Sequence, residues 1–255
     1  MGKPASAEEK GNGLKLIDAA RKGDVRLCRE LLPVADPLAV DNAGNTALIM
    51  AAYCGDAKVI ALLLPRSDPL AADQLGETAL ILAARKGHAE VVDLLLPHGD
   101  PQAADNDGET ALMKAAWAGH AEVVALLLSH GAPLASNKDG QTALTLAAEY
   151  VHPEIVSILL AHGDPLAADN LGRTALMCAA RNGDGECVGL LLPVSDVSAT
   201  DVRGRNAAKV ARERGHDELA EHIESYQWAM QEKRAIGGAA ADPGHPVGGC
   251  RPRAL

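Results

Sequence analysis

The chain is short of aromatic residues, because its 255 residues include two Trp, three Tyr and no Phe. Ordinary globular cores rely on aromatic side chains to fill volume. Hydrophobic residues nevertheless make up 47% of the chain, which excludes a disordered polymer. The core must therefore be built from small aliphatic side chains on thin, closely packed elements. Ala-rich helices are the elements that this composition favours.

Positive charge is also in deficit, since 24 Lys and Arg face 34 Asp and Glu and give a formal net charge of −10. Nucleic-acid backbones are bound through Lys and Arg with release of counterions, so nucleic acid is disfavoured as a partner. No apolar run approaches the roughly 20 residues that span a bilayer, and no signal-peptide core is visible. We therefore expect no membrane association and a cytoplasmic location, with export as an effector as the alternative.

Disulfide and metal-ligand patterns are missing as well. The cysteines, which form no CxxC pair, are Cys28, Cys54, Cys178, Cys187 and Cys250. Seven histidines recur at two positions of a repeat: His88, His120, His152 and His216, and His98, His130 and His162. Their spacing is that of the repeat and not of a ligand set, so we expect no metal. Because no phosphate-binding or hydrolase motif is present, we also expect no cofactor, no small-molecule substrate and no catalysis.

What the sequence has in abundance is a repeat with a period of 32 residues. Five copies open on Gly-x-Thr-Ala-Leu, and a degenerate copy follows at Gly204. The five copies begin at Gly44, Gly76, Gly108, Gly140 and Gly172. Each continues with an Ala-Ala pair and a Leu-rich segment, and in four of the five a glycine stands three residues after the pair. No insertion interrupts the spacing.

The copy at 41–72 shows what one unit predicts. The hydroxyl of Thr46 is placed to cap a first helix, whose apolar stripe includes Ala51 and Ala52. Gly55 ends that helix, because glycine adopts the left-handed conformation without penalty. A second apolar helix follows over 59–64, and Ser-Asp-Pro reads as a turn. Val151 replaces this glycine in the fifth unit, so we expect an altered turn over 150–153.

The pattern G-x-T-A-L-x-x-A-A-x-x-G-H-x-x-V-V-x-L-L-L, clearest at 73–104 and 105–136, resembles the ankyrin repeat. The resemblance covers about residues 12–232, although the period is 32 rather than 33 and the family's T-P-L-H element has lost Pro and His. It implies an all-α solenoid of about seven helix-turn-helix units with short hairpin loops. The implied organisation is a flexible N-terminus (1–11), caps at about 12–40 and 201–232, internal repeats at 41–72, 73–104, 105–136, 137–168 and 169–200, and a disordered tail (233–255).

The informative variation lies in the two residues between each Ala pair and the following glycine. In the family that the chain resembles, these positions and the loop tips line a concave surface that binds proteins. Three of the five aromatic residues stand there and alternate with arginines, and Trp, Tyr and Arg dominate interface hot spots. The candidate concave residues are Tyr53, Arg85, Lys86, Trp117, Tyr150 and Arg181. The candidate loop-tip residues are the acidic Glu77, Asp107, Glu109 and Asp139 and the basic Arg173.

The sequence thus predicts an adaptor or scaffold that binds a protein or an extended peptide on its concave face without catalysis. Arg85, Trp117 and Tyr150 would form a continuous strip about 20 Å long, if units stack at helix-packing distances. A solvated face with chance aromatics is the competing interpretation of these positions. A second functional class also fits, namely an inhibitory or neutralising protein that blocks an enzyme or a host target by occupying its surface. Polar residues at both ends of the array favour a monomer.

Overall fold

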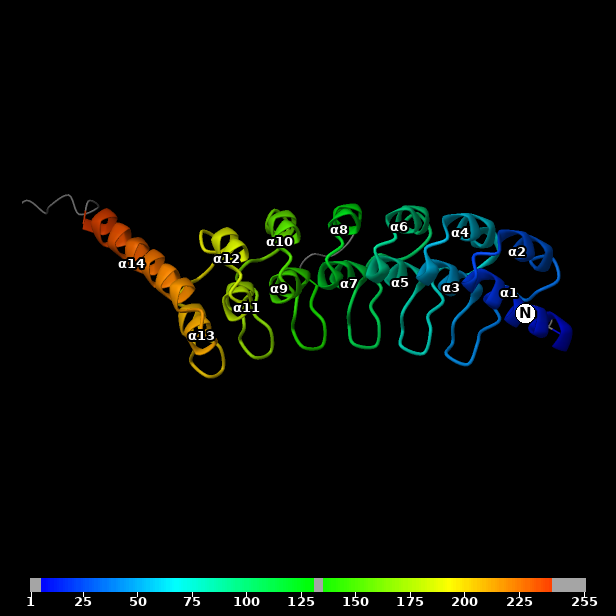
Figure 1. The fold of residues 1–255 in the computed structure, drawn as a ribbon, viewed down its shortest axis with the longest axis horizontal. Coiled ribbons are helices and arrows are strands. Elements are labelled where there is room, and N and C mark those ends of the chain that lie inside the picture. The colour runs from blue at the N-terminus through cyan, green and yellow to red at the C-terminus, as the bar shows by residue number, and fades with distance from the viewer. Residues whose placement is uncertain (1–5, 131–134, 240–255) are drawn as a thin grey trace, which may run out of the picture.

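The computed structural model describes residues 6–130 and 135–239, and within them the chain forms seven consecutive pairs of helices (Figure 1). A single 3-10 turn, Leu64–Arg66, follows α4. The pairs are α1 (Ala7–Arg21) with α2 (Val25–Leu31), α3 (Ala47–Cys54) with α4 (Ala57–Leu63), α5 (Ala79–Lys86) with α6 (Ala89–Leu95), α7 (Ala111–Ala118) with α8 (Ala121–Leu128), α9 (Ala143–Glu149) with α10 (Pro153–Leu160), α11 (Ala175–Asn182) with α12 (Gly185–Leu191), and α13 (Ala207–Glu213) with α14 (Asp217–Ala239). The predicted all-α repeat solenoid is confirmed.

From α1 to α12 the helices form two layers, with the first helix of each pair in one layer and the second helix in the other, whereas α14 leans away from the second layer (Figure 1). Small side chains let the first helices approach one another closely. Ala51 and Ala52 of α3 are fully buried, as are Ala83 and Ala84 of α5. One continuous core runs along the array, and among the described aromatics only Tyr226 packs against it. This packing explains how so aromatic-poor a chain builds a core.

The ends of the first helices are fixed by the residues that the repeat supplies. The Thr46 hydroxyl accepts a hydrogen bond from the Ile49 backbone N–H (3.2 Å) and caps α3. Gly55 ends the helix with a φ of 80°, a left-handed conformation that side chains disfavour. The same capping hydroxyl recurs at Thr78, Thr110, Thr142 and Thr174. The predicted start and end signals of the repeat are therefore confirmed.

Hairpins join each pair to the next and lie in a row below the first helices in Figure 1. Within the hairpin at 73–78, the Asp73 carboxylate accepts hydrogen bonds from the backbone N–H groups of Leu75 and Glu77. Neighbouring hairpins are also tied together, because the Gln74 N–H donates to the Ala43 carbonyl (3.0 Å). Buried or bonded polar groups of this kind hold a loop in place. The row of hairpins is therefore a fixed surface.

Histidines join the units to one another. The ring Nε2 of His88 lies 3.2 Å from the carbonyl oxygen of Tyr53 in the preceding unit, and His120 and His152 repeat the arrangement. The ring also lies against the glycine that ends the preceding first helix, such as Gly55. No group of three or more His, Cys, Asp or Glu that could hold a metal ion occurs among the described residues.

Both ends of the described array are more helical than the sequence predicted. Residues 7–11, expected to be flexible, begin α1, because Ser6 and Glu9 form a reciprocal capping box. Residues 233–239, expected to be disordered, continue α14 to Ala239. The rest of the two predicted flexible segments, 1–5 and 240–255, lies outside the described residues. No helix in the described part of the chain is long and apolar enough to cross a membrane.

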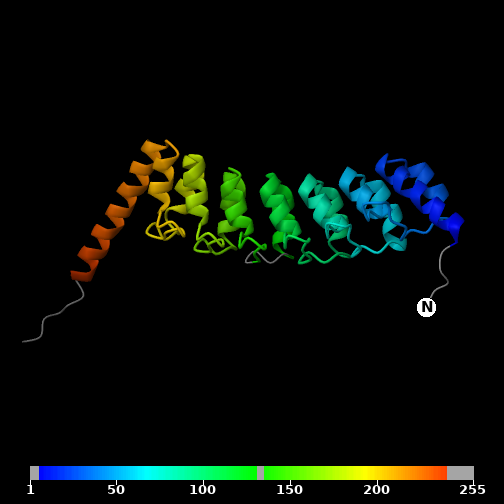
Figure 2. The ribbon, with the colours of Figure 1, turned by 90° about the horizontal axis from the view of Figure 1, so that it is seen from below.

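The residue at the turn after α9 keeps the left-handed conformation, although it is Val151 and not glycine. Val151 has a φ of 64° and is the one described residue other than glycine with a positive φ. The helix before it, α9, ends at Glu149 and has seven residues where α7 has eight, but α13 is equally short before Gly215, so this length is not specific to Val151. Pro153 opens α10. In Figure 2 the pairs stand side by side in a row, and α14 leans away from that row.

Candidate protein-binding face

Three aromatic side chains are exposed at the ends of first helices. Tyr53 keeps 39% of its surface exposed, Trp117 41% and Tyr150 48%. The surface that these helix ends form with the hairpins is called the concave face below. The rings of Trp117 and Tyr150, from neighbouring units, meet edge to face with centroids 5.7 Å apart. The Lys86 ammonium lies 4.5 Å from the centroid of the Tyr53 ring, a cation–π distance. These aromatics are therefore held by neighbours in the adjacent unit.

Glu77 does not face solvent, contrary to the sequence prediction, and Arg85 is only partly exposed. The Arg85 Nη1 lies 2.6 Å from the Glu77 carboxylate, whose side chain is only 3% exposed. Burial raises the pKa of Glu77, and the charges of Arg85 and Lys114 oppose that rise. Glu77 is thus an internal partner of α5 and not a loop-tip residue, because it follows the glycine of the hairpin and turns back toward the helix.

Arg173 and Arg181 converge on one carboxylate. Their Nη1 atoms lie 3.4 Å and 3.2 Å from the Glu149 Oε1 at the end of α9. Gln141 donates a third hydrogen bond to the same side chain (2.7 Å), and Arg173 also pairs with Asp169 (2.6 Å). Both arginines are thereby committed to contacts inside the array, between adjacent units or within the same hairpin.

The acidic loop residues divide into two groups. Glu109 contacts the ammonium of Lys114, which also lies 2.8 Å from Asp105. Burial acts to raise the pKa of Asp105, but hydrogen bonds from Lys114 and from two backbone N–H groups outweigh it and lower that pKa. Asp107 and Asp139, by contrast, are exposed at the hairpin tips. The exposed predicted site residues are therefore Tyr53, Lys86, Asp107, Trp117, Asp139 and Tyr150.

A hollow of about 390 Å³ opens on the concave face over the first three units. Its apolar lining comes from Met50, Tyr53, Leu75 and Leu82, and Asp73 is among its polar lining residues. The sequence reading identified Tyr53 and Arg85 here but missed Asp73 and Leu75. The sequence did contain a signal for this site. Leu82 stands at the repeat position of Lys114, so this unit lacks the lysine that pairs with the hairpin aspartate in the next unit.

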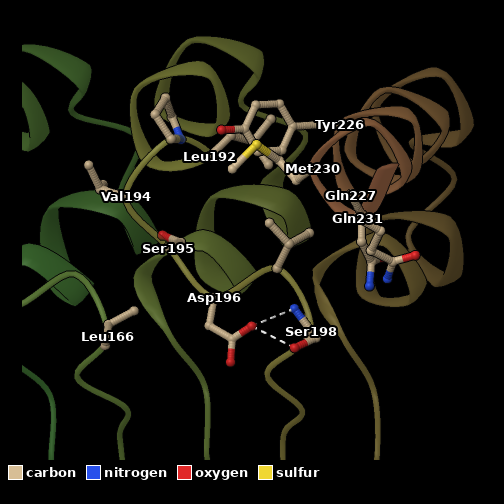
Figure 3. A pocket seen from close by; sticks show the side chains of 12 residues that line it. Leu166, Leu192, Val194, Ser195, Asp196, Ser198, Tyr226, Gln227, Met230 and Gln231 are labelled. Carbon is tan, nitrogen blue, oxygen red and sulfur yellow. Dashed lines mark hydrogen bonds between the residues drawn. The ribbon is translucent and has the colours of Figure 1, made fainter. Parts of the chain in front are cut away.

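A second groove of about 440 Å³ lies at the other end of the array (Figure 3). Tyr226 and Met230 of α14 line it together with Leu192 and Val194, which follow α12. Asp196 closes one side and accepts hydrogen bonds from the backbone and the hydroxyl of Ser198. The sequence analysis did not predict this groove, although its lining residues lie within the predicted array of 12–232.

The four described thiols are not activated as nucleophiles. Burial raises the pKa of Cys28 to about 11 and that of Cys178 to about 12. Burial also raises the pKa of Cys187, together with a hydrogen bond to Asp184. Cys54 is exposed, but partial burial raises its pKa as well. Nucleophilic cysteines need lowered pKa values, so these side chains fit structural use.

The family comparison agrees with this architecture. The family described as ankyrin repeats (three copies) matches residues 16–104, 59–138, 88–169 and 133–201. The chain belongs to the ankyrin-repeat family. Ankyrin repeats are generally protein–protein interaction modules and are typically non-catalytic. Comparison with curated proteins finds no match.

Proposed function

We propose that this chain binds a protein or an extended peptide along its concave face and performs no catalysis. The observation that carries the proposal is the placement of the aromatic side chains. The core uses almost none of them, yet Tyr53, Trp117 and Tyr150 stand half-exposed at equivalent or adjacent positions of three units. Exposed aromatics that neighbouring residues already order lose little conformational entropy on binding. They are therefore well suited to anchor a partner.

The ion pairs indicate which of the predicted site residues are available to contact a partner. Because Arg85 and Arg181 neutralise Glu77 and Glu149, they support the shape of the face and contribute less to partner contact. Lys86 lies against the Tyr53 ring, and Asp107 and Asp139 remain available at the edges of the face. The proposed contact surface is thus an aromatic centre with a charged rim, which is the usual anatomy of a protein interface.

Capture from a lysate tests the proposal. The wild-type protein is compared with a variant in which Tyr53, Trp117 and Tyr150 are all alanine, and the captured protein is then titrated against both. Alanine suits the end of a helix, so the variant should keep its circular dichroism spectrum. We expect at least about tenfold weaker binding, because hot-spot aromatics each contribute on the order of 2 kcal/mol.

Trp228→Ala is the matched control, since Trp228 on α14 is an aromatic residue with 66% exposure away from the concave face. Binding that the control preserves and the triple variant loses supports the proposal. Equal binding by the folded triple variant contradicts it. If the captured protein is an enzyme, an assay of its activity with and without this chain separates an inhibitor from a scaffold.

A further inference from the structure

One hairpin carboxylate on the concave face lacks the cation that its counterparts have. Four hairpins begin with an aspartate whose Oδ2 pairs with a basic side chain: Asp41 with Arg21, Asp105 with Lys114, Asp169 with Arg173 and Asp201 with Arg205. Asp73 occupies the same position in the third unit. Among the described residues, no Lys, Arg or His lies within 4 Å of its carboxylate.

The sequence of the third unit explains this difference. Lys114 supplies the cation in the fourth unit, and the equivalent residue here is Leu82. Arg173 supplies it in the sixth unit, and the equivalent residue here is Glu77. The third cation position is that of Arg21, which pairs with Asp41, and its equivalent here is Tyr53. All three positions that hold a cation elsewhere are thus neutral or acidic around Asp73. Arg85, which also lines the hollow, pairs through its Nη1 with Glu77.

The hollow in front of Asp73 has apolar walls. Tyr53 and Leu75 are exposed by 39% and 62%, and Met50 and Leu82 form the floor between them. Its volume of about 390 Å³ exceeds that of any single side chain. A long aliphatic stem that ends in a cation matches such a site, because Lys and Arg bury their stems on apolar surface while the charged head meets a carboxylate.

We propose that this hollow binds a lysine or arginine side chain of the partner, with the stem against Tyr53 and Leu75 and the cation at Asp73. This inference rests on the proposed function, because it names the partner chemistry at one end of the same face. The nearby cations of this chain are engaged elsewhere. Arg21 pairs with Asp18 and Asp41, and Lys86 lies over the Tyr53 ring.

Methionine methyl resonances report directly on this site. Met50 lines the hollow, whereas Met113 and Met177 are buried in the core and Met230 lines the groove at α14. The full chain, labelled with ¹³C at its methionine methyls, is titrated with the capped peptide acetyl-Gly-Arg-Gly-amide. The neutral isostere is the same peptide with citrulline in place of arginine. We expect a saturating shift at Met50 with the arginine peptide and little change at the other methyls.

Asp73→Asn is the decisive variant, and the chain itself shows that it should fold. Asn137 stands at the same position of the fifth unit, and its side-chain oxygen accepts the same two backbone hydrogen bonds. We expect Asp73→Asn to weaken the arginine peptide about tenfold, the loss of one charge-assisted hydrogen bond. Asp93→Asn, which changes an exposed carboxylate on α6 of the same unit and outside the concave face, should have no effect. An equal response to citrulline, an unchanged affinity of the Asp73→Asn variant, or no shift at Met50 overturns the inference.

A displayed peptide library separates this inference from the proposed function. Peptides selected on the wild-type protein are sequenced and then tested on the Tyr53, Trp117 and Tyr150 triple alanine variant. Enrichment of Lys or Arg at one position, lost when the selection uses Asp73→Asn, supports the inference. Peptides that need the aromatics but show no basic preference overturn the inference and leave the proposed function intact. Peptides that the triple variant still binds contradict the proposed function.

Discussion

Replacing Asp184 by histidine should destabilise the array, because Val151 occupies the space that the histidine ring requires. Three consecutive units place a histidine at this position, and a glycine of the preceding unit faces its ring. A Cβ atom built on Gly55, Gly87 or Gly119 would lie 2.5–2.7 Å from the nearest ring atom. Real Cβ atoms do not approach other atoms so closely, so a side chain and a ring exclude each other there.

Val151 fits against the next unit because the sixth unit carries Asp184, and not a histidine, at this position. An aspartate needs less space than a histidine at this position. A Cβ on Gly23 of the first unit would meet a single carboxylate oxygen of Asp56, the equivalent aspartate, at 2.6 Å. A carboxylate at the end of a short side chain moves away with a small rotation, whereas an imidazole ring has three atoms in the way. The pair of Val151 and Asp184 is therefore a coupled departure from the repeat.

The expected cost of Asp184→His has two parts. Forcing the ring against Val151 costs about 1–3 kcal/mol, as for other overpacked sites. The change also removes a helix cap worth about 1 kcal/mol, because Asp184 Oδ1 accepts the Glu186 and Cys187 N–H groups and the histidines of other units make no such bond. The free energy of unfolding should therefore fall by about 2–4 kcal/mol.

Val151→Gly supplies the rescue. Alone it should change the free energy of unfolding by less than about 1 kcal/mol, because relief of the left-handed strain, about 1–2 kcal/mol, is offset by lost side-chain burial and by the greater freedom of glycine when unfolded. In the Asp184→His background it should restore about 1–3 kcal/mol by removing the clash. The double variant then has the glycine and histidine of the three preceding units.

Urea unfolding of the four proteins, followed by circular dichroism and by tryptophan fluorescence, measures this double-mutant cycle. Agreement between the two probes checks that the array unfolds as one unit, which long repeat arrays do not always do. A coupling energy below about 0.5 kcal/mol, the limit for independent sites, would refute the steric argument. So would an Asp184→His variant as stable as the wild type.

Three further predictions concern the ion pairs and the thiols. Arg85→Ala should lower the free energy of unfolding by about 2 kcal/mol. This is less than the roughly 3–5 kcal/mol lost when a fully buried ion pair is broken, because the Arg85 side chain keeps 27% exposure. Urea midpoints measure the loss, and Arg85→Lys should recover part of it. The lowered pKa of Asp105 stabilises the fold above the ordinary aspartate pKa of about 3.9, and that stability is lost as the pH falls through the lower folded value. Asp105→Asn should therefore flatten the acid limb of a stability–pH profile, and an unchanged limb would contradict the assignment. In a Cys250→Ser variant, a thiol reagent should label the exposed Cys54 in the folded state. It should label the buried Cys28, Cys178 and Cys187 only after unfolding, and the number of labelled thiols per chain with and without urea measures this.

The repeat units were predictable because their determinants are local. Thr46 and Gly55 specify the start and end of α3 within the helix itself, and the period carries the same signals to the other units. The capping box of Ser6 and Glu9 is equally local and is visible in the sequence, yet the charged, Gly-containing segment around it led to an expectation of flexibility. The length of α14 was missed for a related reason, since its last turns contain consecutive glycines.

The ion pairs of the concave face were harder to predict because they depend on how a hairpin folds back on its helix. A spacing of eight residues joins Glu77 to Arg85, and it also joins Gln141 to Glu149 and Arg205 to Glu213. Complementary residues at this spacing are a signal that the sequence contains. It can be recognised only once the residue after the hairpin glycine is known to turn toward the helix end rather than toward solvent.

The same spacing of eight residues indicates which units leave a helix-end side chain free to contact a partner on the proposed face. Where the helix-end residue and the hairpin residue eight positions earlier are complementary, the two pair with each other, as Glu77 pairs with Arg85. Where the helix-end residue is Tyr53 or Trp117, the equivalent hairpin residue turns to its own unit, because Asn45 bonds to Asp41 and Glu109 contacts Lys114. The aromatic ring is then left without a hairpin partner and stays exposed. We therefore expect specificity to concentrate in these units. Asp73, the one aspartate at the start of a described hairpin that has no cation, lines the same hollow as Tyr53.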